Sequence, residues 1–191
     1  MAGLRDGLGD GLSVTRRRWL KLLGTSAIGS TTLHSSVIAQ SAASSPITTV
    51  DQLLGLNQAQ IESVYRQGTV AGLPAGKVRG TALVSPGTSR NRIMSRGARL
   101  VWQGKIINPT DAIAVNRFFG IKIIRAQVYQ GTSWLDGGES LILDYSHTSR
   151  IYASNRDEIR LIAPGLYLGL MYARATPQPT LSLVFALEAR A

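Results

Sequence analysis

The chain has 191 residues and a net charge of +10, with 44% apolar and 17% charged residues. This composition supports a folded core and excludes a chain that is disordered by composition. Because the sequence contains no cysteine, it also excludes disulfides, thiolate metal sites, a cysteine nucleophile and a lipidated cysteine anchor.

The first 43 residues have the features of an export signal. The run TRRRWLK at 15–21 contains the pair Arg16 and Arg17, and a weakly apolar stretch and a Ser/Ala-rich segment follow it. We predict a twin-arginine signal peptide over 1–43, recognition by the twin-arginine (Tat) translocase, and a periplasmic or secreted protein. An amphipathic helix with a chance arginine run is the alternative. The stretch lacks the roughly 18 continuous apolar residues of a spanning helix, so no stable transmembrane anchor is expected.

Residues 44–72 are predicted to form a helical lead-in. Apolar residues recur at 53, 54 and 56 and again at 61, 64 and 65, which fits one face of a helix. Asn57 is suited to cap the second helix, with Gln60 as its capping-box partner, and Gly68 ends the segment. One or two short helices are therefore expected to cover one end of a sheet.

Residues 73–191 are predicted to form a β-barrel domain. Twenty glycines and seven prolines indicate many turns. Asp136-Gly137 is a strong hairpin signal, and Pro164-Gly165 suits a type II turn. The large side chains of the last strand recur at every second position and so share one face. Strands are expected at 77–84, 99–107, 121–129, 140–145, 157–163, 166–173 and 181–187.

This pattern predicts a mainly β fold. An antiparallel meander of this kind must close or leave strand edges that need covering. We therefore expect a closed or nearly closed barrel of about seven or eight strands, with room inside for packed side chains or one small ligand.

Several segments resemble known bacterial sequences. Trp102-Gln103-Gly104-Lys105 is similar to the family named for a Gly-x-Trp-x-Gly-Lys (GXWXGK) stretch, with Leu100 in place of its first glycine. The segments 73–76 and 167–171 are also similar to that family, and the segments 133–137, 143–146, 156–160 and 164–169 resemble a group of exported bacterial proteins of uncharacterised function. The resemblance implies a lipocalin-like small β-barrel, and it implies no established activity or catalytic residue.

The sequence contains few signals of chemistry. Beyond residue 43 the one histidine is His147, and paired-histidine metal motifs, phosphate-binding glycine loops and serine-nucleophile elbows are absent. Ser146 and His147 are adjacent, so they would point to opposite faces of an extended chain. The basic residues are dispersed, unlike those of nucleic-acid modules. No catalytic residue, metal, cofactor or nucleic-acid partner is predicted.

Seven residues are candidates for ligand binding. In a strand, an inward-facing charge needs a partner and could instead anchor the polar end of a ligand. Aromatic side chains could line a pocket, although they equally build an ordinary core. Asn116 could bind a ligand or hydrogen-bond a bent backbone, and its place before Gly120 favours a role in a turn. The candidates are Trp102, Asn116, Trp134, Asp144, Tyr145, Arg160 and Tyr167.

The expected function is binding of a hydrophobic or amphiphilic, lipid-like small molecule inside the barrel. Two alternatives stay open. The first is a small β-barrel enzyme of the isomerase or cyclase type that uses Asp144, Tyr145 and Arg160. The second is an envelope interaction protein whose basic surface holds anionic partners.

Overall fold

The computed structural model describes residues 46–72 and 74–189, so the predicted signal segment lies outside the described residues. Two helices precede the barrel, α1 (Val50–Leu53) and α2 (Gln58–Gln67). Each begins with a capping box, Thr49 with Gln52 and Asn57 with Gln60. The predicted lead-in helices and the predicted cap at Asn57 are both observed.

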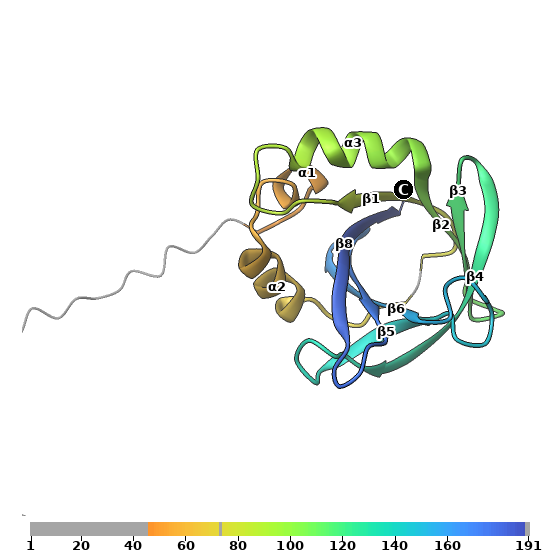
Figure 1. Cartoon of the computed structure of the whole chain (residues 1–191). Helices are drawn as coiled ribbons and strands as arrows, with labels where there is room; N and C mark the ends of the chain where they lie inside the picture. The colour runs from red at the N-terminus through yellow and green to blue at the C-terminus, as the bar shows by residue number, and fades with distance from the viewer. Residues whose placement is uncertain (1–45, 73, 190–191) are drawn as a thin grey trace, which may run out of the picture. The chain divides into compact units, whose positions relative to one another are not determined.

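Residues 76–189 form a closed barrel of eight antiparallel strands, as the sequence predicted (Figure 1). Each strand pairs with the next along the chain, and the last pairs with the first, so no edge stays open. The strands are β1 (Gly76–Leu83), β2 (Trp102–Asn108), β3 (Ile113–Phe118), β4 (Ile121–Thr132), β5 (Glu139–Asp144), β6 (Asn155–Ala163), β7 (Leu166–Ala173) and β8 (Thr180–Ala189).

The segment between β1 and β2 differs from the prediction. Residues 91–101 form a third helix, α3 (Asn91–Val101), so the strand predicted from residue 99 begins at Trp102. The buried residues of α3 are the polar Asn91 and Ser95. Their burial is tolerated because Asn91 donates to the carbonyl of Leu54 (3.0 Å) and accepts from Ser95 (3.2 Å). Its large apolar side chains are exposed instead. A surface helix usually buries its apolar side and exposes its polar side, and α3 does the reverse. For this reason the sequence pattern did not predict α3.

Strand β3 was also not predicted, because it is short and ends at a tight turn. It pairs with β2 on one side and with β4 on the other. A bulge in β4 leaves Ile124 with a φ of 62° and without a partner on β3. Asn116 therefore lies in a strand and not in the turn that its sequence context suggested.

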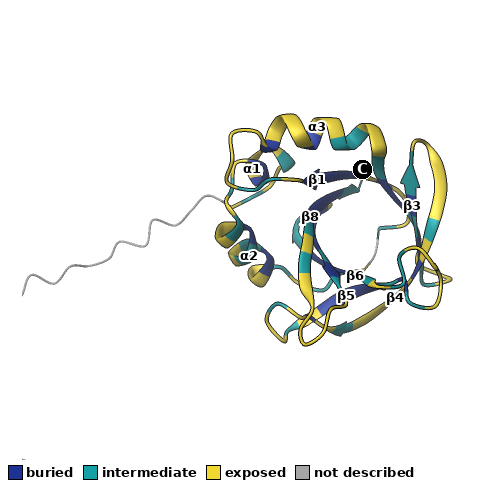
Figure 2. Ribbon diagram, in the orientation of Figure 1, coloured by how far each residue is buried: buried dark blue, intermediate teal, exposed yellow. Residues whose placement is uncertain are grey.

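The barrel wall is packed on both faces along β6, β7 and β8 (Figure 2), whereas alternate residues of β4 are exposed. Alternate side chains of β8 illustrate this, because Phe185 and Leu187 belong to the inner cluster while Val184 and Ala186 belong to the outer one. The outer cluster joins α1 and α2 to β7 and β8, and Tyr65 of α2 reaches Ser140 of β5 with a 2.6 Å hydrogen bond. Within the described part of the chain, no helix is long and apolar enough to cross a membrane.

Candidate functional site

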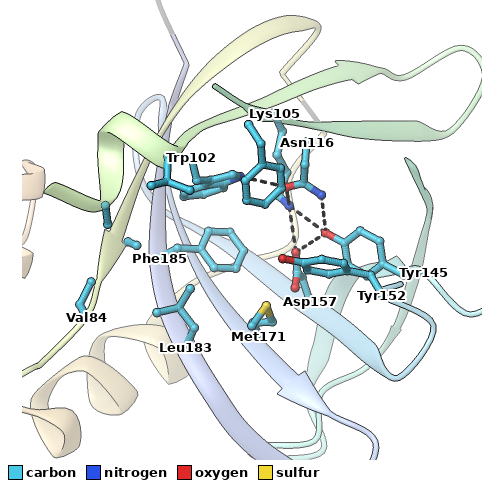
Figure 3. Close-up of a pocket in the computed structure, with 14 residues that line it drawn as sticks. Val84, Trp102, Lys105, Asn116, Tyr145, Tyr152, Asp157, Met171, Leu183 and Phe185 are labelled. Carbon is cyan, nitrogen blue, oxygen red and sulfur yellow. Dashed lines mark hydrogen bonds and ion pairs between the residues drawn. The ribbon is translucent and has the colours of Figure 1, made fainter. Parts of the chain in front are cut away.

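One end of the barrel interior contains a cavity of about 340 Å³ (Figure 3). Most of its wall is apolar, with aromatic, aliphatic and methionine side chains. At its mouth Val84 and Val101 are 36% and 42% exposed, so the cavity opens where β1 ends and α3 joins β2. The lining residues are Ala82, Val84, Ala98, Val101, Trp102, Lys105, Asn116, Phe118, Tyr145, Tyr152, Asp157, Met171, Leu183 and Phe185.

Four buried polar residues meet at the wall of this cavity. Lys105 comes from β2, Asn116 from β3, Tyr145 from the end of β5 and Asp157 from β6. The Lys105 ammonium lies 2.7 Å from Asn116 Oδ1, 2.9 Å from Tyr145 Oη and 2.9 Å from Asp157 Oδ2. We call these four residues the polar quartet. Each is at most 4% exposed, so the ion pair inside it is shielded from water.

The donors of the polar quartet are all used within the protein. Lys105 has three protons and three acceptors. The Tyr145 hydroxyl donates to Asp157 Oδ2 over 2.6 Å. Asn116 Nδ2 donates to Tyr145 Oη (3.1 Å) and to the carbonyl of Ile124 (3.3 Å), which the bulge in β4 exposes to it.

The acceptors are used as well, with one exception. Asn116 Oδ1 also accepts from the indole nitrogen of Trp102 over 3.0 Å. The second carboxylate oxygen of Asp157, Oδ1, is buried and has no hydrogen-bond partner among the described residues. This oxygen is therefore the one remaining bonding position of the quartet. Because a buried polar atom without a partner costs free energy, a donor placed there would be stabilising.

Burial fixes the protonation state of the tyrosine in the quartet. Burial itself, and then the negative charge of Asp157, raise the pKa of Tyr145 well above its usual value of 10.0. Tyr145 is therefore a neutral phenol that donates a hydrogen bond at any physiological pH. The neighbouring Tyr152, half-buried at the cavity wall, has its pKa raised by the same two causes.

Two glycines make room for the aromatic wall of the cavity. Trp102 and Phe185 meet edge to face, with ring centroids 5.5 Å apart. A Cβ at Gly169 would lie 2.2 Å from the Phe185 ring, and one at Gly80 would lie 2.6 Å from the Trp102 ring. Both rings therefore lie directly against a strand that has no side chain at that point.

Three of the seven predicted binding residues line the cavity, namely Trp102, Asn116 and Tyr145. Tyr167 packs in the inner cluster but not at the cavity, and its hydroxyl donates to the carbonyl of Gly72 (2.9 Å). Trp134 lies outside the barrel, edge to face with Tyr172 at 5.6 Å. The structure therefore brings together less than half of the predicted set.

Asp144 and Arg160 also lie outside the cavity, and they do not pair with each other. Asp144 bonds to Arg174 over 2.7 Å, while Arg160 forms a two-pronged ion pair with Asp136 at 2.7 and 2.8 Å. Both residues face outward, because they neighbour the inward-facing Leu143 and Ile159, and the strand register places Asp144 opposite Arg156 instead of Arg160. The predicted grouping of Asp144, Tyr145 and Arg160 is therefore not formed.

The sequence interpretation missed Lys105, Asp157 and Phe185. A signal was available for both charged residues, because Lys105 shares its face with Ile107 and Asp157 shares its face with Ile159. A charge that alternates in phase with the inward aliphatic residues of a strand is an inward charge.

Together these features define a small closed antiparallel barrel with an internal, mainly apolar cavity and one buried polar cluster. No protein-family model matches the sequence, and no curated protein matches it. A solved structure of a protein from Thermomonospora curvata is similar in fold, with a TM-score of 0.50 and 17% identity. The match covers 72% of this chain and 90% of that one, which supports the barrel fold and nothing about its chemistry.

Proposed function

We propose that the barrel binds a hydrophobic or amphiphilic small molecule in its cavity, with the polar end of the ligand at the quartet. The observation that carries this proposal is an apolar cavity of about 340 Å³ whose wall includes a buried carboxylate with one oxygen unpartnered in the described chain. Small-molecule sites combine an apolar lining with a few fixed polar groups in this way.

The bonding pattern of the quartet favours a particular ligand class. Every donor is already engaged, and the unused position is the acceptor Asp157 Oδ1. A ligand with a hydroxyl or amino group can donate to that carboxylate, whereas a carboxylate ligand would meet an acceptor of like charge. We therefore propose that the ligand is an aliphatic alcohol or amine, or a larger molecule with such an end.

Equilibrium binding of three matched probes tests this proposal. Decanol and decylamine are expected to bind more tightly than decanoate, as measured by native mass spectrometry and by the change in tryptophan fluorescence, to which Trp102 at the cavity wall contributes. The double variant Lys105→Met with Asp157→Leu should remove the preference for a donor and leave apolar binding, because it leaves neither charge buried and unpaired. Equal affinity for all three probes in the wild type would refute the proposed ligand class. The absence of binding by any probe, together with no copurified lipid, would refute the cavity as a binding site.

A matched pair of substitutions tests the location. Leu183 lines the cavity, whereas Leu181, two residues earlier, packs on the outer cluster because a bulge in β8 separates them. Leu183→Trp should narrow the cavity and weaken probe binding, while Leu181→Trp should leave it unchanged. Similar effects of both substitutions would place binding elsewhere.

An enzyme is the second candidate, because Asp157 and Tyr145 meet beside the cavity. An Asp base and a neutral Tyr donor are the groups that a proton-transfer isomerase or cyclase needs. Incubating the extracted ligand with the protein in deuterated water tests this candidate. Exchange of a carbon-bound proton that is lost in Asp157→Asn would support an enzyme, and no exchange in the wild type would reject it.

We also propose that the protein is exported through the twin-arginine translocase. The support is the sequence at 15–43, with its paired arginines, weakly apolar stretch and small residues in the correct order. Replacing Arg16 and Arg17 by lysine should leave the protein inside the cell, as measured by fractionation and immunoblotting. Unchanged export of this variant would reject the proposal.

A further inference from the structure

Helix α3 carries its large apolar side chains on the side that faces solvent. Ile93 and Leu100 are 73% and 76% exposed, and Met94 and Val101 are each 42% exposed. These positions share one side of the helix, and Gly97 lies between them. Asn91 and Ser95, which are buried, lie on another side. The exposed apolar stripe therefore contributes nothing to the core.

The apolar stripe continues onto the neighbouring turn of the barrel. The backbone nitrogen of Phe119 donates to the carbonyl of Val101 over 2.9 Å, which joins the β3–β4 turn to the end of α3. Phe119 in this turn and Ile121, the first residue of β4, are 70% and 63% exposed. We call the exposed apolar residues of α3 and this turn the apolar rim: Ile93, Met94, Leu100, Val101, Phe119 and Ile121.

Basic side chains border the apolar rim. Arg92, Arg96 and Arg99 recur at helical spacing along another side of α3. Arg92 pairs with Asp51 at 3.1 Å, whereas Arg96 is exposed and forms no ion pair within the described part of the chain. The rim is thus flanked by positive charge along the length of the helix.

A basic hollow lies beside the end of α3. It measures about 240 Å³ and contains four cationic side chains, of which Arg79 pairs with Glu188 at 3.6 Å. Partial burial, and then the charge of Arg79, lower the pKa of Arg99. The hollow is lined by Lys77, Arg79, Gly80, Arg99, Gln103 and Arg117.

The apolar rim is continuous with the mouth of the ligand cavity. Val101 belongs to both, and Phe118 lines the cavity while the next residue, Phe119, lies on the rim. Whatever surface covers the rim therefore lies at the entrance to the cavity.

From these observations we infer that α3 and the β3–β4 turn dock the barrel onto an anionic lipid bilayer. The apolar rim inserts at the level where headgroups meet acyl chains, and the flanking arginines and the basic hollow hold lipid phosphates. An exposed helix with an apolar side and a basic side is the type that lies in a membrane interface. Because the rim lies at the mouth of the cavity, the ligand enters from the bilayer, which rests on the ligand-binding function proposed above.

Single labelled cysteines can locate the docked face, since the full chain has no cysteine of its own. An environment-sensitive dye on Ile93→Cys or Phe119→Cys should shift to shorter wavelength with vesicles of phosphatidylcholine mixed with phosphatidylglycerol, and much less with phosphatidylcholine alone. A dye on Asp111→Cys, in the exposed turn at the opposite end of the barrel, should not shift. Vesicle binding without a shift at 93 or 119 would overturn the inference.

Substitutions in the full chain measure the two contributions while keeping the basic N-terminal segment constant. Leu100→Gln combined with Phe119→Gln should weaken partitioning about tenfold or more. Arg96→Gln should weaken it about fivefold at low salt and less at high salt. The matched control Arg66→Gln, an exposed arginine on α2, should change little. Equal losses from Arg96→Gln and Arg66→Gln would reduce the effect to net charge and overturn the inference.

Two further readouts separate the remaining outcomes. If the apolar rim instead joins two copies of the chain, the Leu100→Gln/Phe119→Gln variant will convert a dimer to a monomer in analytical ultracentrifugation, which overturns the inference. The same variant should bind decanol from solution as the wild type does but take it more slowly from vesicles. If the wild type does not bind decanol, the proposed cavity function is refuted. The dye shifts at positions 93 and 119 then test membrane docking independently.

Discussion

Strand β6 carries two buried polar clusters on its opposite faces, and they differ in how completely they are bonded. Inside the barrel, Asp157 belongs to the quartet and keeps one oxygen without a partner in the described chain. Outside, Glu158 accepts from the Ser133 hydroxyl at 2.6 Å and from the Trp134 backbone at 2.8 Å, and pairs with Arg156 at 3.1 Å. Both clusters are buried ion pairs, and complete bonding distinguishes the outer one.

The outer cluster acts as a structural connection. Arg160, on the same face, donates to the carbonyls of Glu139 and Tyr65 and pairs with Asp136 of the β4–β5 turn. Its guanidinium also lies 4.6 Å from the Tyr65 ring. The cluster thus fastens α2 and the β4–β5 turn to the barrel. The inner cluster instead crosses the barrel interior, because Lys105 of β2 contacts Asp157 of β6 and these two strands do not pair with each other. Under the function proposed above, its unpartnered oxygen is the ligand contact.

The largest effect is expected from breaking the outer cluster. Glu158→Ala should destabilise the protein by about 3–5 kcal/mol, because Arg156 is left buried without its partner and Ser133 and the Trp134 backbone lose an acceptor. Urea unfolding followed by circular dichroism measures the loss. The control Glu139→Ala removes an exposed carboxylate that forms no ion pair in the described chain, and it should cost little. Comparable losses would contradict the structural role.

A double substitution in the inner cluster sharpens the comparison. Lys105→Met should destabilise by several kcal/mol, since it leaves the Asp157 carboxylate buried and unpaired. Adding Asp157→Leu should recover most of that loss, because apolar replacement of both partners of a buried pair is often neutral. The double variant should fold yet fail to discriminate decanol from decanoate. If it stays as unstable as Lys105→Met, the quartet is itself a stabilising device.

Alkaline pH should also act on the inner cluster through Tyr145. Its pKa is raised above 10.0 by burial and by Asp157, so the unfolded chain loses the phenolic proton first. This contribution is fully present below pH 10.0 and is lost as pH rises above it, by about 1.4 kcal/mol for each pH unit. Tyr145→Phe should show a correspondingly shallower decline in urea unfolding above that pH. Parallel declines would mean that Tyr145 ionises normally.

Alternation made most of the barrel predictable from sequence. The hairpin of β6 and β7 was located by its Pro164-Gly165 turn. In β8, Leu183, Phe185 and Leu187 follow a period of two, whereas the bulge turns Leu181, predicted on the same face, to the outer cluster. The Asp136-Gly137 turn lies between β4 and β5 as expected. These elements are specified locally, so a single sequence was sufficient to identify them.

The site was less predictable because both faces of the wall are buried at β6. In β6, residues 156–160 are all buried, so burial alone does not reveal which charges point inward. Asp157 and Arg160 have opposite orientations, and only their phase relative to Ile159 separates them. Helix α3 was missed for the opposite reason, because its apolar side chains face solvent. Its pattern reflects a surface partner instead of the core.

The smallest effect is expected for Asp144, whose ion pair with Arg174 is partly exposed to solvent, unlike the ion pairs of the two buried clusters. Burial alone would raise the pKa of Asp144, but hydrogen bonds from Ser146, Arg174 and Tyr129 outweigh it and hold the pKa at about 2, below the usual 3.8. Its contribution to stability is therefore present above pH 3.8 and is lost as pH falls toward 2. Because the pair is partly open to solvent, we expect Asp144→Asn to remove no more than about 1 kcal/mol of this acid sensitivity, measured by urea unfolding across that range. The exposed control Glu139→Gln should keep the wild-type pH profile. If Asp144→Asn lost as much stability as Glu158→Ala, the distinction between buried and partly exposed ion pairs would not hold.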